Sequence, residues 1–294
     1  MSYFKAFLVG ICLLVMADRS GATPGKLENV TIVVSSCDRY GDLWDPFFKL
    51  LFKYWHSLKT YNKDIPIILI SNERDFAAEG VQVYKTGKDA SWSSNMMKVL
   101  KSVKTKYVLY LQEDYLIAAP VDERRLQYLL EKMAQEHVVA IEFQKNSYFE
   151  KQPPFPGVEG AVGKDNIPPF KASLQAGLWE KSVFESLIKE GESAWDFEKE
   201  GTKRSRQIQE PFLALVSGIP ISFVNACHLG FLEESAVTLL EREGMSLKSV
   251  GLPLSSDYPL TWGLRDIRPH ILFRWWVAVL RFFNPKFAKN SYKG

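Results

Sequence analysis

The sequence predicts an α/β fold in which a mostly parallel sheet carries helices on both faces. Short apolar runs rich in Val and Ile alternate along the chain with segments whose apolar residues recur at helical spacing. The chain has 294 residues and is 46% hydrophobic, which is enough for one large domain with its own core. Polar residues directly follow several of the expected strands, where open α/β sheets bind their ligands.

The apolar runs predict the strands. Residues 30–36 and 107–111 are the clearest, because they are rich in apolar and β-branched side chains, as in a strand buried on both faces. The other expected strands are residues 65–70, 81–84, 138–143, 174–179 and 221–226.

Helical spacing and capping residues predict the helices. One is expected to begin at Asp45-Pro46, with Asp45 as the N-cap and Pro46 in the first turn. A second is expected to be capped by Ser93 or Ser94. Further helices are expected at residues 121–134, 181–188 and 209–217, and a loop rich in Pro and Gly at residues 151–169.

Composition and charge exclude several classes of protein. The chain is too apolar for a disordered protein, and its three cysteines exclude a disulfide scaffold and a multi-cysteine zinc module. Residues 265–294 carry seven Lys and Arg against one Asp, so the rest of the chain has a net charge of −3. We therefore do not expect nucleic acid to be a partner.

Both ends of the chain carry apolar segments. Residues 4–16 are interrupted only by Lys5, and their length fits a signal sequence, a short anchor or an extension. Residues 271–283 are aromatic and place Arg274 and Arg281 on one helical face, as in a helix on a membrane surface or one packed on the domain. The expected parts are an apolar segment at 1–26, the α/β domain at 27–232 and a C-terminal region with an amphipathic helical tail at 233–294.

The tail and the cysteines bear on localisation. An odd number of cysteines and a basic tail favour a peripheral position on the cytoplasmic face of a membrane. The alternative is the lumen of the secretory pathway, reached through the N-terminal segment.

Two adjacent carboxylates, Glu113 and Asp114, directly follow the expected strand at residues 107–111. Such a pair is costly at the end of a buried strand without a cation, and Mg²⁺ and Mn²⁺ bind through one or two carboxylates plus substrate phosphates. The alternative is an acidic pair in a turn or at a helix start. His228, which follows the last expected strand, is either a third metal ligand or a structural histidine.

Ser35 and Ser36 end the first expected strand, and Asp38 follows it. Small polar residues there allow a nucleotide to approach closely, with Asp38 accepting a hydrogen bond from the base or ribose. The sequence has no G-x-G-x-x-G and no G-x-x-x-x-G-K-[ST], so a dinucleotide fingerprint and a P-loop are both absent. It also lacks G-x-S-x-G and H-E-x-x-H, so hydrolase chemistry is unsupported.

Residues 192–198 combine aromatic and acidic side chains. Trp195 offers an aromatic surface, while Asp196 and Glu198 are candidate general bases. The nearby Arg204 and Arg206 are candidates for contacting a diphosphate. The alternative is the start of a surface helix with solvated charges.

Five stretches of sequence occur in a characteristic order: TIVVSSCDRYGDLWDPFF, IPIILISNE, SWSSNMMKVLKSVKTKYVLYLQEDYLI, SLQAGLW and SAWDFE. In this order, over residues 30–198, the chain resembles nucleotide-sugar glycosyltransferases of the GT-A fold. It is similar to the bacterial and viral enzymes that build surface polysaccharides. The resemblance implies a Rossmann-like GT-A domain.

The resemblance also implies roles for individual residues. Those implied to bind the donor or to border the acceptor are Ser35, Ser36, Asp38, Ser71, Asn72, Trp92, Asn95, Gln175, Trp195, Arg204 and Arg206. Glu113 and Asp114 occupy the place of the family's D-x-D metal motif, although the first acid of that motif is replaced here. Glu198, or else Asp196, falls in the acidic segment that supplies the base of inverting members.

The implied activity is transfer of a sugar from a nucleotide-sugar donor to a hydroxyl of a glycan or lipid-linked acceptor, with inversion and with Mn²⁺ or Mg²⁺. Residues 201–206 are expected to form a loop that closes over the donor. One alternative is a non-catalytic nucleotide-sugar or glycan-binding protein. Another is a sugar-nucleotide pyrophosphorylase, which needs a Gly-rich phosphate loop where this chain has Gly41 alone.

Overall fold

The computed structural model describes residues 26–144, 149–164, 170–228, 230–246 and 250–254. The apolar N-terminal segment and the aromatic stretch at residues 271–283 lie outside these ranges, so their predictions are not tested. Among the described residues, no helix combines the length and the apolar character needed to cross a bilayer.

An eight-stranded sheet organises the fold, in the order β3-β2-β1-β4-β8-β6-β9-β7. Six of the eight strands point in one direction, while β8 and β7 run opposite to their neighbours. The strands are β1 (Val30–Ser35), β2 (Ile67–Ser71), β3 (Val81–Lys85), β4 (Tyr107–Gln112), β6 (Ala140–Glu142), β7 (Ala161–Gly163), β8 (Gly177–Glu180) and β9 (Phe212–Leu215). The predicted mostly parallel sheet is confirmed.

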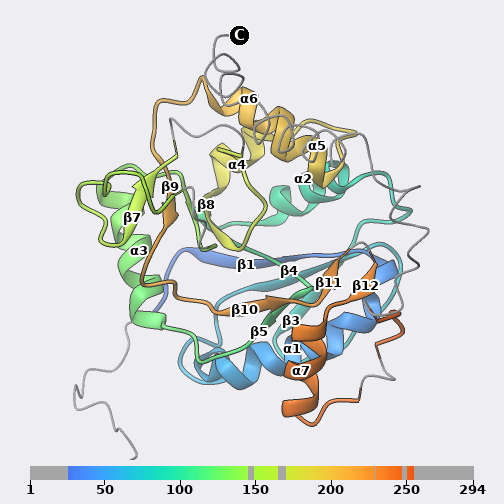
Figure 1. Cartoon of the computed structure of the whole chain (residues 1–294). Coiled ribbons are helices and arrows are strands. Elements are labelled where there is room, and N and C mark those ends of the chain that lie inside the picture. The colour runs from blue at the N-terminus through green and yellow to red at the C-terminus, as the bar shows by residue number, and fades with distance from the viewer. Residues whose placement is uncertain (1–25, 145–148, 165–169, 229, 247–249, 255–294) are drawn as a thin grey trace, which may run out of the picture.

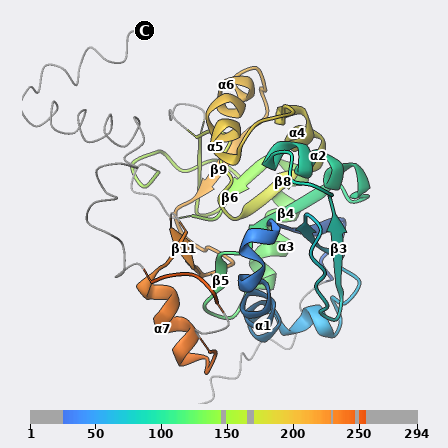
Figure 2. The same ribbon diagram turned by 90° about the vertical axis from the view of Figure 1, so that its right-hand side faces the viewer.

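Helices cover both faces of this sheet (Figures 1 and 2). Because side chains alternate along a strand, Ile32 and Val34 of β1 enter one apolar core while Val33 enters the other. The first core is completed by α1 (Trp44–Tyr54), α3 (Glu123–Gln135) and α7 (Glu234–Arg242), and the second by α2 (Trp92–Ser102) and α4 (Lys181–Leu187). Helix α7, which falls in the expected C-terminal region, therefore buries its apolar face in the core of the α/β domain.

Short elements lie around the carboxyl ends of the strands. Strand β5 (Tyr115–Ile117) pairs with β10 (Phe223–Asn225), and β11 (Cys227–His228) pairs with β12 (Phe231–Leu232), both antiparallel. Helices α5 (Ala194–Asp196) and α6 (Thr202–Ser205) are joined by a π-helical turn, Phe197–Gly201. Residues 201–206, expected to be a loop, are therefore helical over most of their length.

Two further element predictions were wrong. The helix expected at residues 209–217 is strand β9, whose four residues are all buried between β6 and β7. A short apolar run fits a buried strand as well as a helix, and here the neighbouring strands decide. The loop expected at residues 151–169 contains edge strand β7.

Both predicted helix caps were displaced towards the N-terminus. The N-cap of α1 is Leu43, so Asp45 lies inside the first turn, where its carboxylate pairs with Lys49 at 2.7 Å. The N-cap of α2 is Ser91, whose Oγ accepts the backbone N–H of Ser94 at 3.0 Å.

Candidate functional site

A cavity of about 190 Å³ lies at the carboxyl ends of β1 and β4, as expected for an open α/β sheet. Among its lining residues are five that the sequence analysis singled out: Ser35, Ser36, Trp92, Asn95 and Glu113. Ala194, at the start of α5, lines the same cavity. The cavity therefore brings together the end of the first strand, the start of α2, Glu113 of the acidic pair and the first residue of the helix that leads to the candidate bases.

Two indole rings fix the serine hydroxyls after β1. The Nε1–H of Trp92 donates to Oγ of Ser35 at 3.1 Å, and that of Trp44 donates to Oγ of Ser36 at 2.6 Å. Sequence reasoning missed Trp44 because it lies in a helix dominated by core residues. Asn95 donates from Nδ2 to Asp89 at 2.9 Å, while its buried Oδ1 has no partner among the described residues. That oxygen is available to accept a hydrogen bond from a ligand in the cavity.

Asp38 joins the loop after β1 to the loop after β2. Its carboxylate accepts hydrogen bonds from the N–H groups of Asn72, Glu73 and Arg74 at 2.8–2.9 Å and from the Ser71 hydroxyl at 3.1 Å. Burial raises the pKa of Asp38, but these hydrogen bonds outweigh it and the net pKa lies below the ordinary value. Asp38, Ser71 and Asn72 thus brace two loops beside the cavity, and their predicted contacts with a nucleotide stay predictions.

Glu113 is buried and its neighbour Asp114 is partly buried. Burial and then the charge of Asp114 raise the pKa of Glu113 well above its ordinary value, and burial raises the pKa of Asp114 to about 7. The Oδ1 of Asp114 is buried and has no hydrogen-bond partner in the described part of the chain. An orphaned carboxylate oxygen beside a second buried acid fits a divalent cation whose remaining ligands come from water or substrate phosphates.

The third predicted metal residue does not join this pair. His228 lies on β11 and is exposed. In the described ranges, no group of three or more His, Cys, Asp or Glu side chains is arranged to hold a metal ion. As far as the described residues go, a cation at this site would therefore depend on Glu113 and Asp114 together with ligands such as water or substrate phosphates.

The main chain of Leu174 joins Glu198 to the acidic end of β4. Its N–H donates to Oε1 of Glu198 at 2.8 Å, and its carbonyl accepts hydrogen bonds from Gln112 Nε2 at 3.0 Å and from the Tyr115 hydroxyl at 3.1 Å. Burial raises the pKa of Glu198, and the hydrogen bond from Leu174 partly offsets this effect. A partly buried carboxylate with a raised pKa has the properties of a general base.

The other acidic candidate has a structural role. The Oδ2 of Asp196 accepts hydrogen bonds from the N–H and the hydroxyl of Ser193 at 3.1 and 2.6 Å, which completes a capping box at the start of α5. These hydrogen bonds lower the pKa of Asp196. Glu198 is therefore the better placed of the two bases. Trp195 beside it is 69% exposed, so its indole ring is free to meet a ligand.

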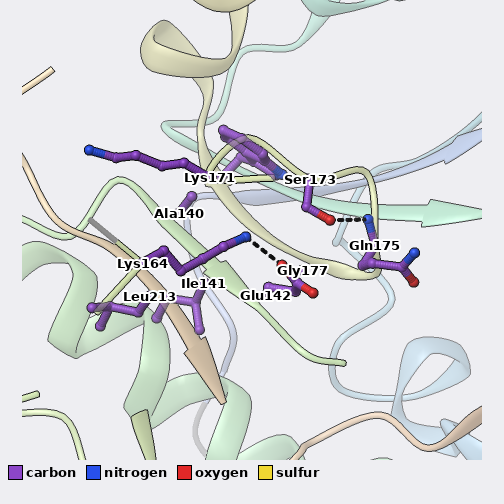
Figure 3. A pocket seen from close by; sticks show the side chains of 10 residues that line it. Ala140, Ile141, Glu142, Lys164, Lys171, Ser173, Gln175, Gly177 and Leu213 are labelled. Atoms are coloured by element: carbon purple, nitrogen blue, oxygen red, sulfur yellow. Dashed lines mark hydrogen bonds and ion pairs between the residues drawn. The ribbon is translucent and has the colours of Figure 1, made fainter. Parts of the chain in front are cut away.

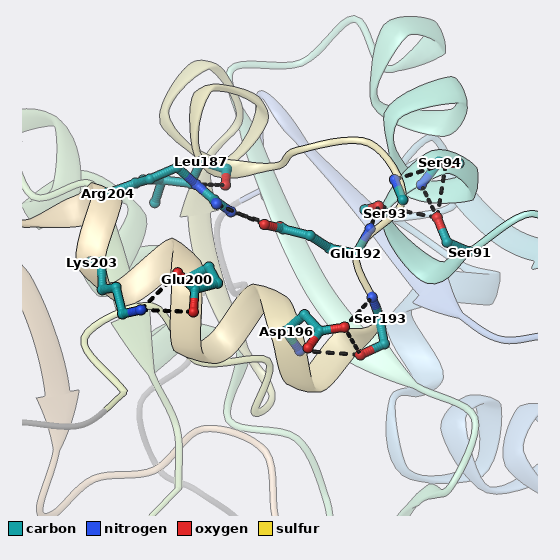
Figure 4. A network of polar contacts seen from close by, with 11 residues as sticks. Ser91, Ser93, Ser94, Leu187, Glu192, Ser193, Asp196, Glu200, Lys203 and Arg204 are labelled. Atoms are coloured by element: carbon teal, nitrogen blue, oxygen red, sulfur yellow. Dashed lines mark hydrogen bonds and ion pairs between the residues drawn. The ribbon is translucent and has the colours of Figure 1, made fainter.

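The two predicted arginines are placed outside the cavity lining. Arg204 forms a bidentate ion pair with Glu192, both N–O distances being 2.7 Å, and its Nε–H donates to the carbonyl of Leu187 at 2.8 Å (Figure 4). Arg206 is exposed. The structure thus gives Arg204 a protein partner in place of the predicted diphosphate.

A buried ion pair that sequence reasoning missed lies near Glu198. The Lys164 ammonium pairs with the carboxylate of Glu142 at the end of β6, and the two side chains are 3% and 9% exposed (Figure 3). They line a cavity of about 10 Å³ together with Lys171, Ser173 and Gln175. The predicted substrate residue Gln175 therefore borders this small cavity rather than the larger one.

No family model matches the chain, and no curated protein matches it. Solved structures with a similar fold include S. aureus TarS 1–349, with a TM-score of 0.45 and 10% identity, covering 66% of this chain and 60% of that one. Another is the mannosyltransferase PcManGT from Pyrobaculum calidifontis in complex with GDP-Man and Mn²⁺, with a TM-score of 0.44 and 11% identity, covering 69% of this chain and 58% of that one.

A third is glucosyl-3-phosphoglycerate synthase from Mycobacterium tuberculosis in complex with Mn²⁺ and UDP-glucose, with a TM-score of 0.43 and 8% identity, covering 77% of this chain and 80% of that one. The chain spans less than two thirds of the length of the first two proteins. The similarity is one of overall chain arrangement, and it assigns no role to any residue of this chain.

Proposed function

We propose that the chain is a glycosyltransferase that moves a sugar from a nucleotide-sugar donor to a hydroxyl of a glycan or lipid-linked acceptor. The observation that supports this most is the main chain of Leu174, which connects the candidate base Glu198 to Gln112, the residue that precedes Glu113 and Asp114 at the end of β4. A base for the acceptor and an acidic site for the donor are thereby built on one edge of the sheet, beside a cavity.

The proposed reaction is a direct displacement. An acceptor hydroxyl loses its proton to Glu198 as its oxygen attacks the anomeric carbon of the donor sugar. The bond between that carbon and the diphosphate oxygen breaks, and the nucleoside diphosphate leaves with the bonding electrons. One base on the side opposite the leaving group gives inversion at the anomeric carbon. Glu113 and Asp114 would hold Mn²⁺ or Mg²⁺, which when bound neutralises charge on the departing diphosphate.

The cavity would hold the nucleotide part of the donor. Ser35 and Ser36 present hydroxyls fixed by Trp92 and Trp44, so little conformational entropy remains to be lost when a ligand binds. The buried Oδ1 of Asn95 has an unmet requirement for a donor, which a ligand N–H or O–H would satisfy.

The test uses the purified full chain, a panel of nucleotide sugars and Mn²⁺. We expect one donor class to raise the melting temperature in a metal-dependent way. Glu198→Gln should keep that shift but lower transfer by about 10²–10⁴-fold, because a general base is lost. Glu200→Gln, two residues further along and paired with Lys203, is the matched control and should transfer normally.

Two results would reject parts of this proposal. Near-normal transfer by Glu198→Gln would remove Glu198 as the base. A melting temperature unchanged by every donor would remove the nucleotide-sugar site and favour a different ligand.

We also propose that the protein works at the cytoplasmic face of a membrane, on the basis of the aromatic and basic sequence at residues 271–283. Replacing Trp275 and Trp276 by Ser should abolish flotation of the full chain with anionic vesicles. Flotation that persists in this variant would contradict the proposed anchor.

A further inference from the structure

The start of α2 is hydrogen-bonded to the segment that leads into the candidate base (Figure 4). The N–H of Glu192 donates to Ser93 Oγ at 2.8 Å, and the N–H of Ser93 donates to the Glu192 carbonyl at 3.1 Å. The N–H of Gly191 donates to Ser94 Oγ at 3.4 Å. The main chain at residues 191–192 is therefore fixed to the helix that supplies one wall of the donor cavity.

An ion pair then closes this segment into a loop. Both carboxylate oxygens of Glu192 accept from the two terminal nitrogens of Arg204 at 2.7 Å, and Arg204 Nε–H also binds the carbonyl of Leu187. The side chains are 12% and 30% exposed. This fork geometry is specific to arginine, because lysine presents a single ammonium group.

Glu198 lies between the two ends that the ion pair joins. Its neighbour Phe197 is fully buried, with its ring centroid 4.9 Å from that of Trp92, the same indole that binds Ser35 in the cavity. Glu198 itself sits in the π-helical turn, a rare local geometry that is frequent at functional sites. The segment also rests on the loop before β8, where Thr202 Oγ1 accepts the N–H of Ala172 at 3.1 Å.

We propose that the Glu192–Arg204 ion pair is a latch that sets the position of Glu198 relative to the donor cavity. Glu192 and Arg204 are then positioning residues, and the inference rests on the proposed transfer function. Loss of the fork frees one end of the loop at residues 192–204, while Thr202 and Phe197 still hold its middle. Glu198 should therefore stay in the site with an imprecise orientation.

The same segment offers a matched control. Lys203, which precedes Arg204 in the sequence, also forms an ion pair with a glutamate, Glu200, at 2.8 Å, but these two side chains are 55% and 38% exposed. An exposed pair of this kind contributes little to structure. Lys203→Met therefore removes an ion pair from the segment without touching the latch.

The experiment compares wild type, Arg204→Lys, Glu192→Gln and Lys203→Met as full chains. Amide hydrogen exchange should become about 10-fold faster at residues 192–205 and at Leu174 in the two latch variants, because local opening becomes easier. Nucleotide affinity should stay within about threefold, while kcat falls by about 100-fold, the cost of a small misplacement of a reacting group. Lys203→Met should match wild type, and the charge-reversed pair Glu192→Arg/Arg204→Glu should recover part of kcat.

Each outcome decides the question. Hydrogen-exchange rates in Arg204→Lys equal to those of wild type would overturn the latch. Faster exchange with an unchanged kcat would also overturn it, because the ion pair would then have a purely structural role. If wild type transfers no sugar from any donor, the proposed function fails. In that case hydrogen exchange at Leu174 tests the latch alone, because the N–H of Leu174 donates the hydrogen bond to Glu198. Faster exchange there in the latch variants would support the latch, and unchanged exchange would reject it.

Discussion

Two acidic sites lie at the ends of parallel strands in the same sheet, and they are neutralised differently. Glu142 at the end of β6 is buried and paired with Lys164 from beside β7. After β4, Glu113 and the Oδ1 of Asp114 are buried too, yet both pKa values are raised and this oxygen has no partner among the described residues. The described residues supply a counter-charge at the first site and none at the second, where the proposed cation would take that role.

The largest effect is expected from removing one partner of the Glu142–Lys164 ion pair. Lys164→Met leaves Glu142 buried without its counter-charge, which should lower the free energy of unfolding by about 3–5 kcal/mol. The double variant Glu142→Met/Lys164→Met should recover most of that loss, since an apolar pair replaces both charges. Urea denaturation measures both variants. Equal loss in the single and the double variant would contradict a role for charge pairing at this site.

A smaller effect concerns a third carboxylate, which is satisfied by hydrogen bonds alone. Asp38→Asn replaces one of two accepting oxygens by an NH₂ group, so some of the N–H groups of residues 72–74 lose their acceptor. We expect a loss of about 1–2 kcal/mol in the free energy of unfolding. Asp42→Asn, on a nearby exposed acid, is the control. Full stability of Asp38→Asn would show that the two loops are held by other contacts.

The third effect has the opposite sign, because removing the carboxylate at the unpaired site should stabilise the protein. In metal-free protein the folded pKa of Asp114 is about 7, above its unfolded value of 3.8, so the folded state binds more protons between these values. Stability should therefore fall as pH rises from about 4 to 7. Asp114→Asn should flatten this slope and should be at least about 1 kcal/mol more stable than wild type at pH 8, since one pKa unit corresponds to 1.36 kcal/mol.

The measurement for this third prediction is urea denaturation with a chelator at pH 5, 6, 7 and 8. A steeper slope in the Asp114→Asn variant, or lower stability at pH 8, would show that the carboxylate has a counter-charge within the protein.

Much of the unpaired site was predictable from the sequence. The sequences of β1 and β4 are mostly apolar, and parallel strands bring their carboxyl ends to one edge of the sheet, so Ser35, Ser36 and Glu113 were expected to meet there. Glu198 was marked as a candidate base by its acidic segment. Its attachment to Leu174 needed the structure, because the two residues are 24 positions apart on irregular segments.

The paired site was not predictable, for physical reasons. Lys164 reaches Glu142 because β9 pairs with both β6 and β7, and β9 was assigned to a helix from its short apolar run. Likewise Glu192 and Arg204 belong to a charged stretch, and from the sequence alone such a stretch is expected to be exposed to solvent. Only the fold shows that one ion pair of this stretch is largely buried while its neighbour at Lys203 is exposed.

Calorimetric titration of Mn²⁺ into the full chain, with and without a nucleoside diphosphate, tests the difference between the two sites most directly. We expect Mn²⁺ binding that strengthens when the diphosphate is present, because the substrate completes the ligands offered by Glu113 and Asp114. The Asp114→Asn variant should lose this Mn²⁺ binding. Glu73 is an exposed acid near the same edge, and the Glu73→Gln variant should keep the binding. Binding that is equal in wild type and Asp114→Asn would contradict the cation site after β4.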